Sequence, residues 1–207
     1  MPLAQMNRMG PGDAAIETLA AYLKAAVFQV GKGPKQRFRL KRVVSGWPEN
    51  FKELEYPSAS ITELAVEEGA HSLTPTALEE TLDQYAPGTV LWKTSEQAIR
   101  QQLDFWVTNQ KERGSIEAAL GELFSPTEER FGIVLQGPEE YWCLPIRYTL
   151  LSHERLDSGD GVQARQRRLR VMVLADVDVV QLRKAVRLDP RLWVNGEPVP
   201  LESTGGP

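Results

Sequence analysis

Residues 145–176, PIRYTLLSHERLDSGDGVQARQRRLRVMVLAD, decide the fold. Apolar and polar side chains alternate along both arms of this stretch, and a period of two is the pattern of a strand with one buried face. The apolar positions are Ile146, Tyr148 and Leu150 on the first arm, and Leu169, Val171, Val173 and Ala175 on the second. Between the arms, DSGDG at 157–161 is a strong turn signal. The stretch predicts a long β-hairpin, whose tip at residues 155–165 we expect to be mobile in the free protein and ordered in an assembly.

Apolar residues at three- and four-residue steps predict two helices, each with one apolar face. The first covers residues 13–30, with Asp13 as its N-cap, and ends before the sequence GKGP, which cannot continue a helix. The second begins after Asn109, carries an apolar stripe as far as Phe124 and closes at Ser125, which precedes a proline. Each helix can therefore pack its apolar face against a sheet.

A strand with one cationic face is predicted directly after the first helix. Along residues 36–44, Phe38 and Leu40 alternate with arginine and lysine, and Gly46 ends the pattern. A further extended segment follows Pro57. These strands can reach the sheet to which the hairpin belongs.

The middle of the chain is less clear than its two ends. Residues 63–88 are ambiguous, and within them residues 76–85 could form a short helix. Residues 89–107 show a strand pattern that is clearest in their second half, and residues 131–135 alternate again before a Gly-Pro turn.

Strands that are grouped, and do not alternate regularly with helices, indicate an α+β fold. We predict a largely antiparallel sheet with two amphipathic helices and a long C-terminal β-hairpin. The length of 207 residues is that of one domain. Prolines and glycines gather at both ends, so we expect a flexible N-terminal arm at residues 1–12, a single α+β domain at 13–185 and an extended C-terminal strap at 186–207.

The composition is that of an ordinary globular protein, with 42% apolar and 25% charged residues. A net charge of −4 argues against a dedicated nucleic-acid binder, because such proteins use many cationic contacts to phosphate. No apolar run approaches the roughly 18 residues of a membrane span, and none has the form of a signal peptide. The single cysteine, Cys143, excludes an intrachain disulfide.

We predict no catalytic residue, no cofactor and no metal, and hence that the chain is not an enzyme. The two histidines, His71 and His153, are far apart in sequence and have no metal-ligand spacing. The glycine-rich piece GKGPK at 31–35 lacks the Gly-Lys-Ser/Thr ending of a phosphate loop and follows a helix. The DSGDG turn lacks the alternating oxygen ligands of a calcium loop.

Cations concentrate on two of the predicted strands, and five of them are our candidate interface residues. Charged edge strands discourage unwanted pairing, and this explanation stays open. The alternative is that a cationic face meets an acidic partner surface, or DNA that passes nearby. The five candidates are Arg37, Arg39 and Lys41 on the strand after the first helix, and Arg168 and Arg170 on the return arm of the hairpin.

Three stretches together resemble the tail terminator proteins of long-tailed bacteriophages. The first is the amphipathic helix at 13–30 followed by the basic strand at 36–44. The second is QQLDFWVTNQKERGSIEAALGELF at 101–124, a strand, a polar bridge and a helix. The third is the pair IRYTLLSHERLDSGDG and RQRRLRVMVLADVDV, the two arms of the hairpin.

The resemblance implies a compact subunit that forms a closed ring with itself, a hexamer, at the head-proximal end of the tail tube. There it would stop tube growth and contact tube and neck proteins, with the sheath of a contractile tail as a further partner. DNA would pass through the lumen only in transit. The protein would be made in the bacterial cytoplasm and end in the virion. Another neck, connector or baseplate component is the first alternative, and a hydrolase or nuclease with a scattered site is the second.

Overall fold

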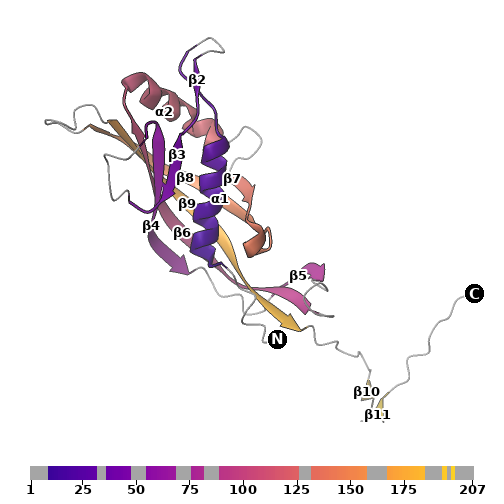
Figure 1. Ribbon diagram of the computed structural model, residues 1–207. Coiled ribbons are helices and arrows are strands. Elements are labelled where there is room, and N and C mark those ends of the chain that lie inside the picture. The colour runs from indigo at the N-terminus through magenta and orange to yellow at the C-terminus, as the bar shows by residue number, and fades with distance from the viewer. Residues whose placement is uncertain are drawn as a thin grey trace, which may run out of the picture.

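Residues 9–31, 36–47, 55–68, 76–81, 89–125, 132–157, 167–184, 193–194 and 197–198 are the part of the chain that the computed structural model describes. Two α-helices within this part lie on one face of a curled, seven-stranded sheet (Figure 1). The fold is α+β with a largely antiparallel sheet, and the predicted fold class is confirmed.

The sheet has the strand order β3–β4–β6–β9–β8–β7, and β5 also pairs with β6. Its strands are β3 (Arg42–Ser45), β4 (Ser58–Glu68), β5 (Thr76–Thr81), β6 (Thr89–Val107), β7 (Ile133–Gln136), β8 (Pro145–Asp157) and β9 (Arg167–Lys184). The described neighbours run antiparallel, apart from the parallel pair β3–β4. β6 and β9 form the central pair, and this ribbon runs beyond both helices toward β5 (Figure 1).

The predicted hairpin is present as β8 and β9, and both strands are longer than predicted. β8 continues through Arg155 to Asp157, so the predicted tip at 155–165 begins too early, and residues 158–166 lie outside the described residues. β9 continues past the predicted end to Lys184, because it follows β6 along its whole length. A register shift between Leu150 and Ser152 marks a bulge in β8.

Helix α1 (Pro11–Ala25) begins earlier and ends earlier than predicted. Gly10 is its N-cap, and Pro11 takes the first turn, where a missing N–H costs nothing. Asp13, predicted as the cap, lies inside the first turn, where its charge complements the helix dipole. Residues 11–12 therefore belong to α1 and not to an N-terminal arm, whose residues 1–8 lie outside the described residues.

The predicted C-terminal part of the first helix is a strand. β1 (Phe28–Gln29) pairs antiparallel with β2 (Arg37–Phe38), so that Phe28 faces Phe38. The predicted single strand over residues 36–44 is consequently wrong. β2 belongs to this small sheet, β3 belongs to the large one, and residues 39–41 connect the two. The helix ends at Ala25, and Phe28 pairs with Phe38 as a strand, although the apolar spacing of the preceding segment continues to Val30.

Residues 63–88 contain strands where they are described. β4 extends to Glu68, and residues 76–81 form β5, so the short helix predicted at 76–85 is wrong over these residues. Pairing with β6 (Thr76↔Lys93, Ala77↔Trp92) supplies the strand's backbone partners. The predicted C-terminal strap is described only at β10 (Trp193–Val194) and β11 (Glu197–Pro198), which pair antiparallel.

Helix α2 (Gln110–Phe124) agrees with its prediction. The Asn109 side-chain oxygen accepts a hydrogen bond from the backbone N–H of Glu112, 2.8 Å away, and so caps the helix. The predicted apolar stripe faces the sheet, with Ile116, Leu120 and Phe124 buried. A short 3-10 turn, η3 (Glu139–Tyr141), follows β7.

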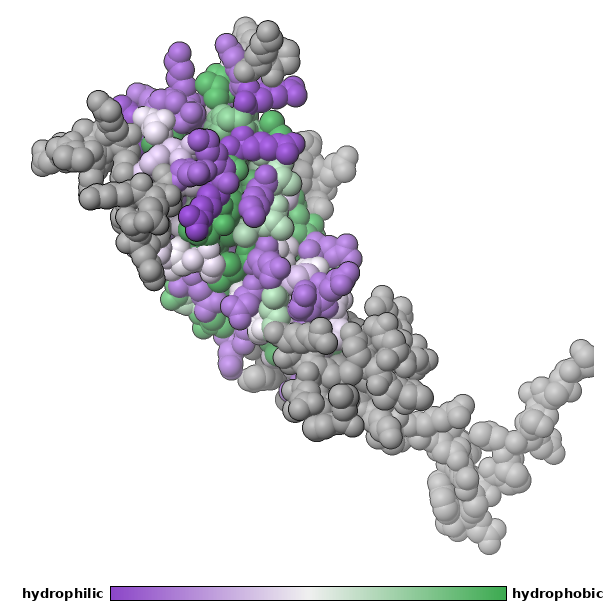
Figure 2. All heavy atoms as spheres, viewed as in Figure 1, coloured by the Kyte–Doolittle hydropathy of each residue, from purple (hydrophilic) through white to green (hydrophobic). Residues whose placement is uncertain are grey.

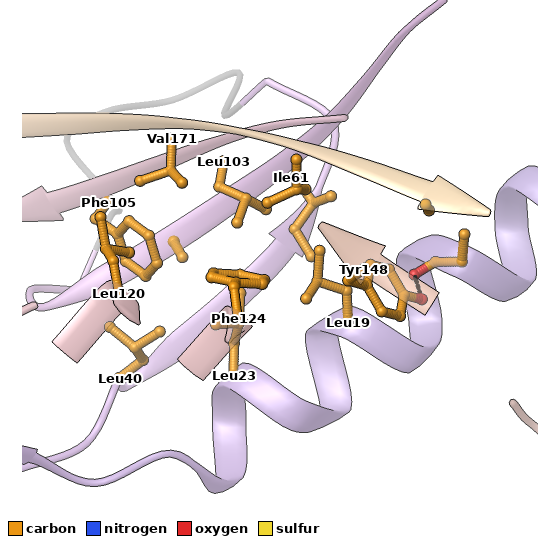
Figure 3. Packing of buried hydrophobic residues seen from close by; sticks show 14 of the residues in the cluster. Leu19, Leu23, Leu40, Ile61, Leu103, Phe105, Leu120, Phe124, Tyr148 and Val171 are labelled. Carbon is orange, nitrogen blue, oxygen red and sulfur yellow. Dashed lines mark hydrogen bonds between the residues drawn. The ribbon is translucent and has the colours of Figure 1, made fainter. Parts of the chain in front are cut away.

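The core lies between the two helices and the sheet (Figure 3). Leu19 and Leu23 of α1 and Phe124 of α2 meet side chains of β4, β6, β8 and β9 there. The Tyr148 hydroxyl donates to the Ala15 carbonyl oxygen at 2.7 Å, which ties β8 to α1, and burial raises the pKa of Tyr148. All of this apolar packing lies on the face of the sheet that the helices cover.

Candidate interaction surfaces

A carboxylate lies buried on the sheet face opposite the helices. Asp104 of β6 is only 1% exposed, and the register places Ser60 of β4 on one side of it and Arg170 of β9 on the other. Beyond Arg170, the register reaches Glu154 of β8. Four strands therefore bring a row of polar side chains together on this face.

Two arginine side chains balance the charge of Asp104, and a glutamine amide donates a hydrogen bond to it. Arg170 Nε donates to Asp104 Oδ1 at 3.4 Å, and Arg168 Nε lies 3.4 Å from the same oxygen. Gln102 Nε2 donates to Asp104 Oδ2 at 2.6 Å, and Arg170 Nη1 donates to Glu154 Oε1 at 3.1 Å. A buried carboxylate needs such partners, because removal from water is costly for an unpaired charge. Two of the five candidate interface residues are thus engaged inside the subunit.

Two aromatic rings contact the Arg168 guanidinium beside this row. Its guanidinium carbon lies 5.4 Å from the ring centre of Trp47 and 5.2 Å from that of Trp106, within cation–π range. The two rings meet edge to face at 5.5 Å, and Trp106 Nε1 donates to Ser60 Oγ at 3.2 Å. Trp47 remains 46% exposed. Sequence reasoning missed Trp47 and Asp104, and only the alternation of Asp104 with Leu103 and Phe105 hinted at its face.

The other three candidates form a separate surface, which we call the cationic strip: Arg37, Arg39 and Lys41. All three side chains are exposed, and Figure 2 shows hydrophilic residues at the end of the molecule where β2 lies. Between them, Phe38 stacks on Phe28 with ring centres 5.3 Å apart, and Leu40 is buried in the core. The Lys41 N–H also donates to the Pro57 carbonyl oxygen at 2.8 Å. The predicted alternation is therefore present, and its apolar members anchor the charged ones.

The structure does not bring the cationic strip against Arg168 and Arg170. β3, which follows Lys41, is separated from β9 by β4 and β6. Three strand spacings correspond to about 14 Å. The five candidates therefore form two surfaces of different character, one exposed and one internally paired.

An acidic surface lies at the far end of β4, along residues 62–68, which we call the β4 edge. β3 pairs only with the first part of β4, up to Ile61, and no other described strand pairs with that side of the remainder. The β4 edge exposes Leu64 by 52% and Val66 by 43%. Its charged residues, Glu63, Glu67 and Glu68, are all acidic and exposed.

An open groove of about 440 Å³ occupies the other end of the uncovered face, and Glu96, Arg147, Asp176 and Asp178 line it. Lys93 lies 2.7 Å from Asp178 and also pairs with Glu96. Burial by itself would lower the pKa of Lys93, but hydrogen bonds to both carboxylates raise it. Burial raises the pKa of Asp176, against the effect of Arg147. No described group of His, Cys, Asp and Glu residues is arranged to hold a metal ion.

His153 of β8 contacts a side chain of α2. His153 Nε2 lies 3.5 Å from Glu117 of α2, and Arg155 Nε donates to the same carboxylate at 2.9 Å. Hydrogen bonding from Arg155 lowers the pKa of Glu117. Cys143 is a free, partly buried thiol, and His71 lies outside the described residues.

Among the described residues, each of the two α-helices has fifteen residues, and neither is long and apolar enough to cross a membrane.

When the chain is compared with family models and with curated proteins, neither comparison finds a match.

Proposed function

We propose that the chain is a structural protein of a bacteriophage virion, a tail terminator that forms a ring at the head-proximal end of the tail tube and joins it to the neck. The cationic strip is the observation that carries this proposal. Phe38 and Leu40 anchor the backbone of the strip to the core, and within the described residues no ion pair joins its charges to an acidic side chain. An exposed run of like charge on an anchored backbone is suited to recognition of an acidic protein surface.

The shape of the subunit supports a role in assembly. The part of the β6–β9 ribbon at Thr89 and Lys184 runs past the helices, so it extends the surface available to neighbours (Figure 1). A ring subunit needs two different surfaces that meet when one copy is rotated onto the next. The cationic strip and the β4 edge differ in charge and lie on different parts of the subunit, which meets this requirement.

The resemblance to tail terminators supports the more specific part of the proposal. It rests on the order of helix, basic strand, Asp-aromatic-Trp strand, second helix and long hairpin. α1, β2 and β3, β6, α2 and the pair β8–β9 follow this order. A different neck, connector or baseplate component built on a similar subunit remains the alternative.

Measurement of mass together with imaging tests the proposal. Light scattering of the purified chain should give six times the 23.2 kDa of one subunit, and negative-stain images should show six-fold rings. Added to purified tail tubes, the protein should bind at one end only. A monomer at all concentrations that binds no tube end would contradict the proposal, and binding at the opposite end would favour a baseplate component.

A further inference from the structure

The ribbon of β1 and β2 has two edges, and only one of them is covered by the described part of the chain. On the β1 side, the Gln29 carbonyl oxygen accepts a hydrogen bond from the Ser115 hydroxyl of α2. On the other side, no described strand pairs with β2, which lies at one end of the molecule (Figure 1). We call this open side of Arg37, Phe38 and Arg39 the β2 edge.

The hydrogen bonds of the ribbon show which backbone groups face the β2 edge. The Val30 N–H donates to the Gln36 carbonyl oxygen at 2.7 Å, so these two residues form a hydrogen-bonded pair. Such pairs alternate with non-hydrogen-bonded pairs along an antiparallel ladder, and Gln29↔Arg37 is therefore of the second kind. The N–H and C=O of Arg37 consequently point away from β1. The bond from α2 to the Gln29 carbonyl agrees with this pattern, because Gln29 likewise points away from its partner strand.

The β2 edge continues to Arg39 and ends before Lys41. The alternation of exposed and buried side chains continues through residue 41, so the backbone groups of Arg39 point the same way as those of Arg37. The N–H of Lys41 already donates to the Pro57 carbonyl oxygen at 2.8 Å. Within the described residues, no such backbone partner meets Arg37 or Arg39 on this side. Unmet donors and acceptors along a strand edge are a template for a further strand.

The side chains of the cationic strip determine which strand can pair there. Arg37, Arg39 and Lys41 are exposed, whereas Phe38 and Leu40 turn toward the core. Residues directly opposite one another in an antiparallel pair interact, and like charges destabilise the pair. A second copy of β2 is therefore disfavoured, which is the protective effect of charge on an edge. Glutamate or aspartate at every second position reverses the sign of this interaction, so an acidic strand is favoured.

Phe38 determines which residues fit between the acids. It is partly buried and stacks on Phe28 with ring centres 5.3 Å apart. The alternate side chains of an added strand would lie beside Phe38, where apolar side chains gain contact and lose exposure to water. The matching sequence is therefore an alternation of acidic and apolar residues. This chain has such a run, Asp-Val-Asp-Val at 176–179, but it lies in β9 and is paired with β6.

We infer that the β2 edge binds an extended segment of another protein, in which acidic and apolar residues alternate, as an added antiparallel strand. The inference rests on the proposed function, because it gives the chemistry of the partner that the cationic strip recognises. Backbone hydrogen bonds to Arg37 and Arg39 supply affinity, and the opposite charges set the register. The edge is short, so a single contact is weak, and a ring that repeats it in every copy strengthens it through multivalency.

Binding of short labelled peptides to the full chain tests the inference. The probe Thr-Glu-Val-Glu-Val-Glu-Thr carries alternating acids. The probe Glu-Glu-Val-Thr-Glu-Val-Thr has the same composition and charge, but it cannot place acids opposite both Arg37 and Arg39. Fluorescence anisotropy should show at least about fivefold tighter binding of the alternating probe. Hydrogen exchange of residues 36–41 should slow when it binds, because the amides of Arg37 and Arg39 become hydrogen-bonded.

N-methylation of the alternating probe separates backbone pairing from attraction between charges. In an added antiparallel strand, the N–H groups of the glutamates face Arg37 and Arg39, so methylation of the glutamate nitrogens should abolish binding. The N–H groups of the valines point away from the β2 edge, and their methylation should leave the affinity within about twofold. These comparisons use the wild-type chain, so they decide the question even if a variant fails to fold.

Matched variants of the chain locate the contact. Arg37→Gln with Arg39→Gln should weaken binding of the alternating probe at least about tenfold, and Arg37→Lys with Arg39→Lys should retain most of it. Lys24→Gln with Lys111→Gln removes two exposed cations from the helices, changes the net charge equally and should leave binding unchanged. Circular dichroism should show native folding for every variant.

Three results would overturn the inference: equal binding of the two probes, undiminished binding after methylation of the glutamates, or tighter binding of a short DNA duplex that the Arg37→Gln/Arg39→Gln variant loses. The first two would reduce the contact to charge attraction, and the third would assign the strip to nucleic acid. Rings that bind one tube end would still support the proposed function in the first two cases. If the alternating probe binds as expected but the chain forms no ring and binds no tube end, the proposed function is overturned and the contact remains.

Discussion

Asp104 shows how one residue organises the polar face of the sheet. Its carboxylate is buried, and Gln102, Arg168 and Arg170 supply the charge and the hydrogen bonds that compensate for lost water. The Arg168 guanidinium also lies over the rings of Trp47 and Trp106. A change at Asp104 should therefore release two arginine side chains at once.

Asp104→Asn should lower the free energy of unfolding by about 2 kcal/mol, since it leaves two partly buried guanidinium groups without their shared anion. Urea denaturation followed by circular dichroism measures the change. Arg100→Gln, at an exposed position on the same strand, is the matched control and should cost about 0.5 kcal/mol or less. Equal stability of the two variants would show that Asp104 is not the centre of this network.

Tyr148 gives a second prediction at this scale. Its hydroxyl is buried and donates to the Ala15 carbonyl oxygen, so Tyr148→Phe should lower the free energy of unfolding by about 1 kcal/mol. Tyr22→Phe removes a comparable bond to Leu123 at a less buried position and should cost less. Thermal denaturation of both variants checks this order, and the reverse order would contradict it.

At the scale of single elements, the bulge in β8 determines which residues reach α2. Because the register shifts between Leu150 and Ser152, His153 pairs with Val171 and Arg155 with Leu169, both of which point into the core. The side chains of His153 and Arg155 consequently lie on the helix-covered face and contact Glu117. Without the extra residue, the side chains of His153 and Arg155 would project from the opposite face.

The contribution of this contact between β8 and α2 to the free energy of unfolding should depend on pH. The pKa of Glu117 is lowered in the folded state, chiefly by Arg155, so its contribution to stability is present above 4.5, the ordinary value, and is lost as the pH falls through the folded pKa. At pH 7, Glu117→Gln should lower the free energy of unfolding by about 1 kcal/mol, and near pH 3 the difference should shrink toward zero. Urea titrations at both pH values measure it. Glu122→Gln on the same helix should show no such trend.

At the scale of the whole molecule, two charged surfaces on different parts of one subunit should make assembly depend on salt. An increase from 0.1 M to 1 M salt shortens the Debye length from about 10 Å to about 3 Å, and should weaken self-association of the wild type. Sedimentation velocity across this range measures the effect. Association that strengthens with salt would contradict this prediction and would indicate an apolar contact.

The parts that could be predicted from sequence depend on local geometry. The alternation around Tyr148 and Val171 identified both arms of the hairpin, and Asn109 identified the start of α2. The exposure of Arg37, Arg39 and Lys41 follows from their alternation with Phe38 and Leu40. Each of these features is decided by neighbours a few residues away, where side-chain period and capping are visible in the sequence.

What the sequence by itself determined is thus the class of fold, its strongest helix and hairpin, and the exposure of the cationic strip. Only the tertiary structure decided that Asp104 is buried between Arg168 and Arg170, that residues 36–44 divide between two sheets, and that β3 pairs with β4 only as far as Ile61. The physical reason is distance along the chain. Asp104 and Arg170 are 66 residues apart in sequence, and their contact exists only because β6 and β9 adopt one register, which no local pattern records.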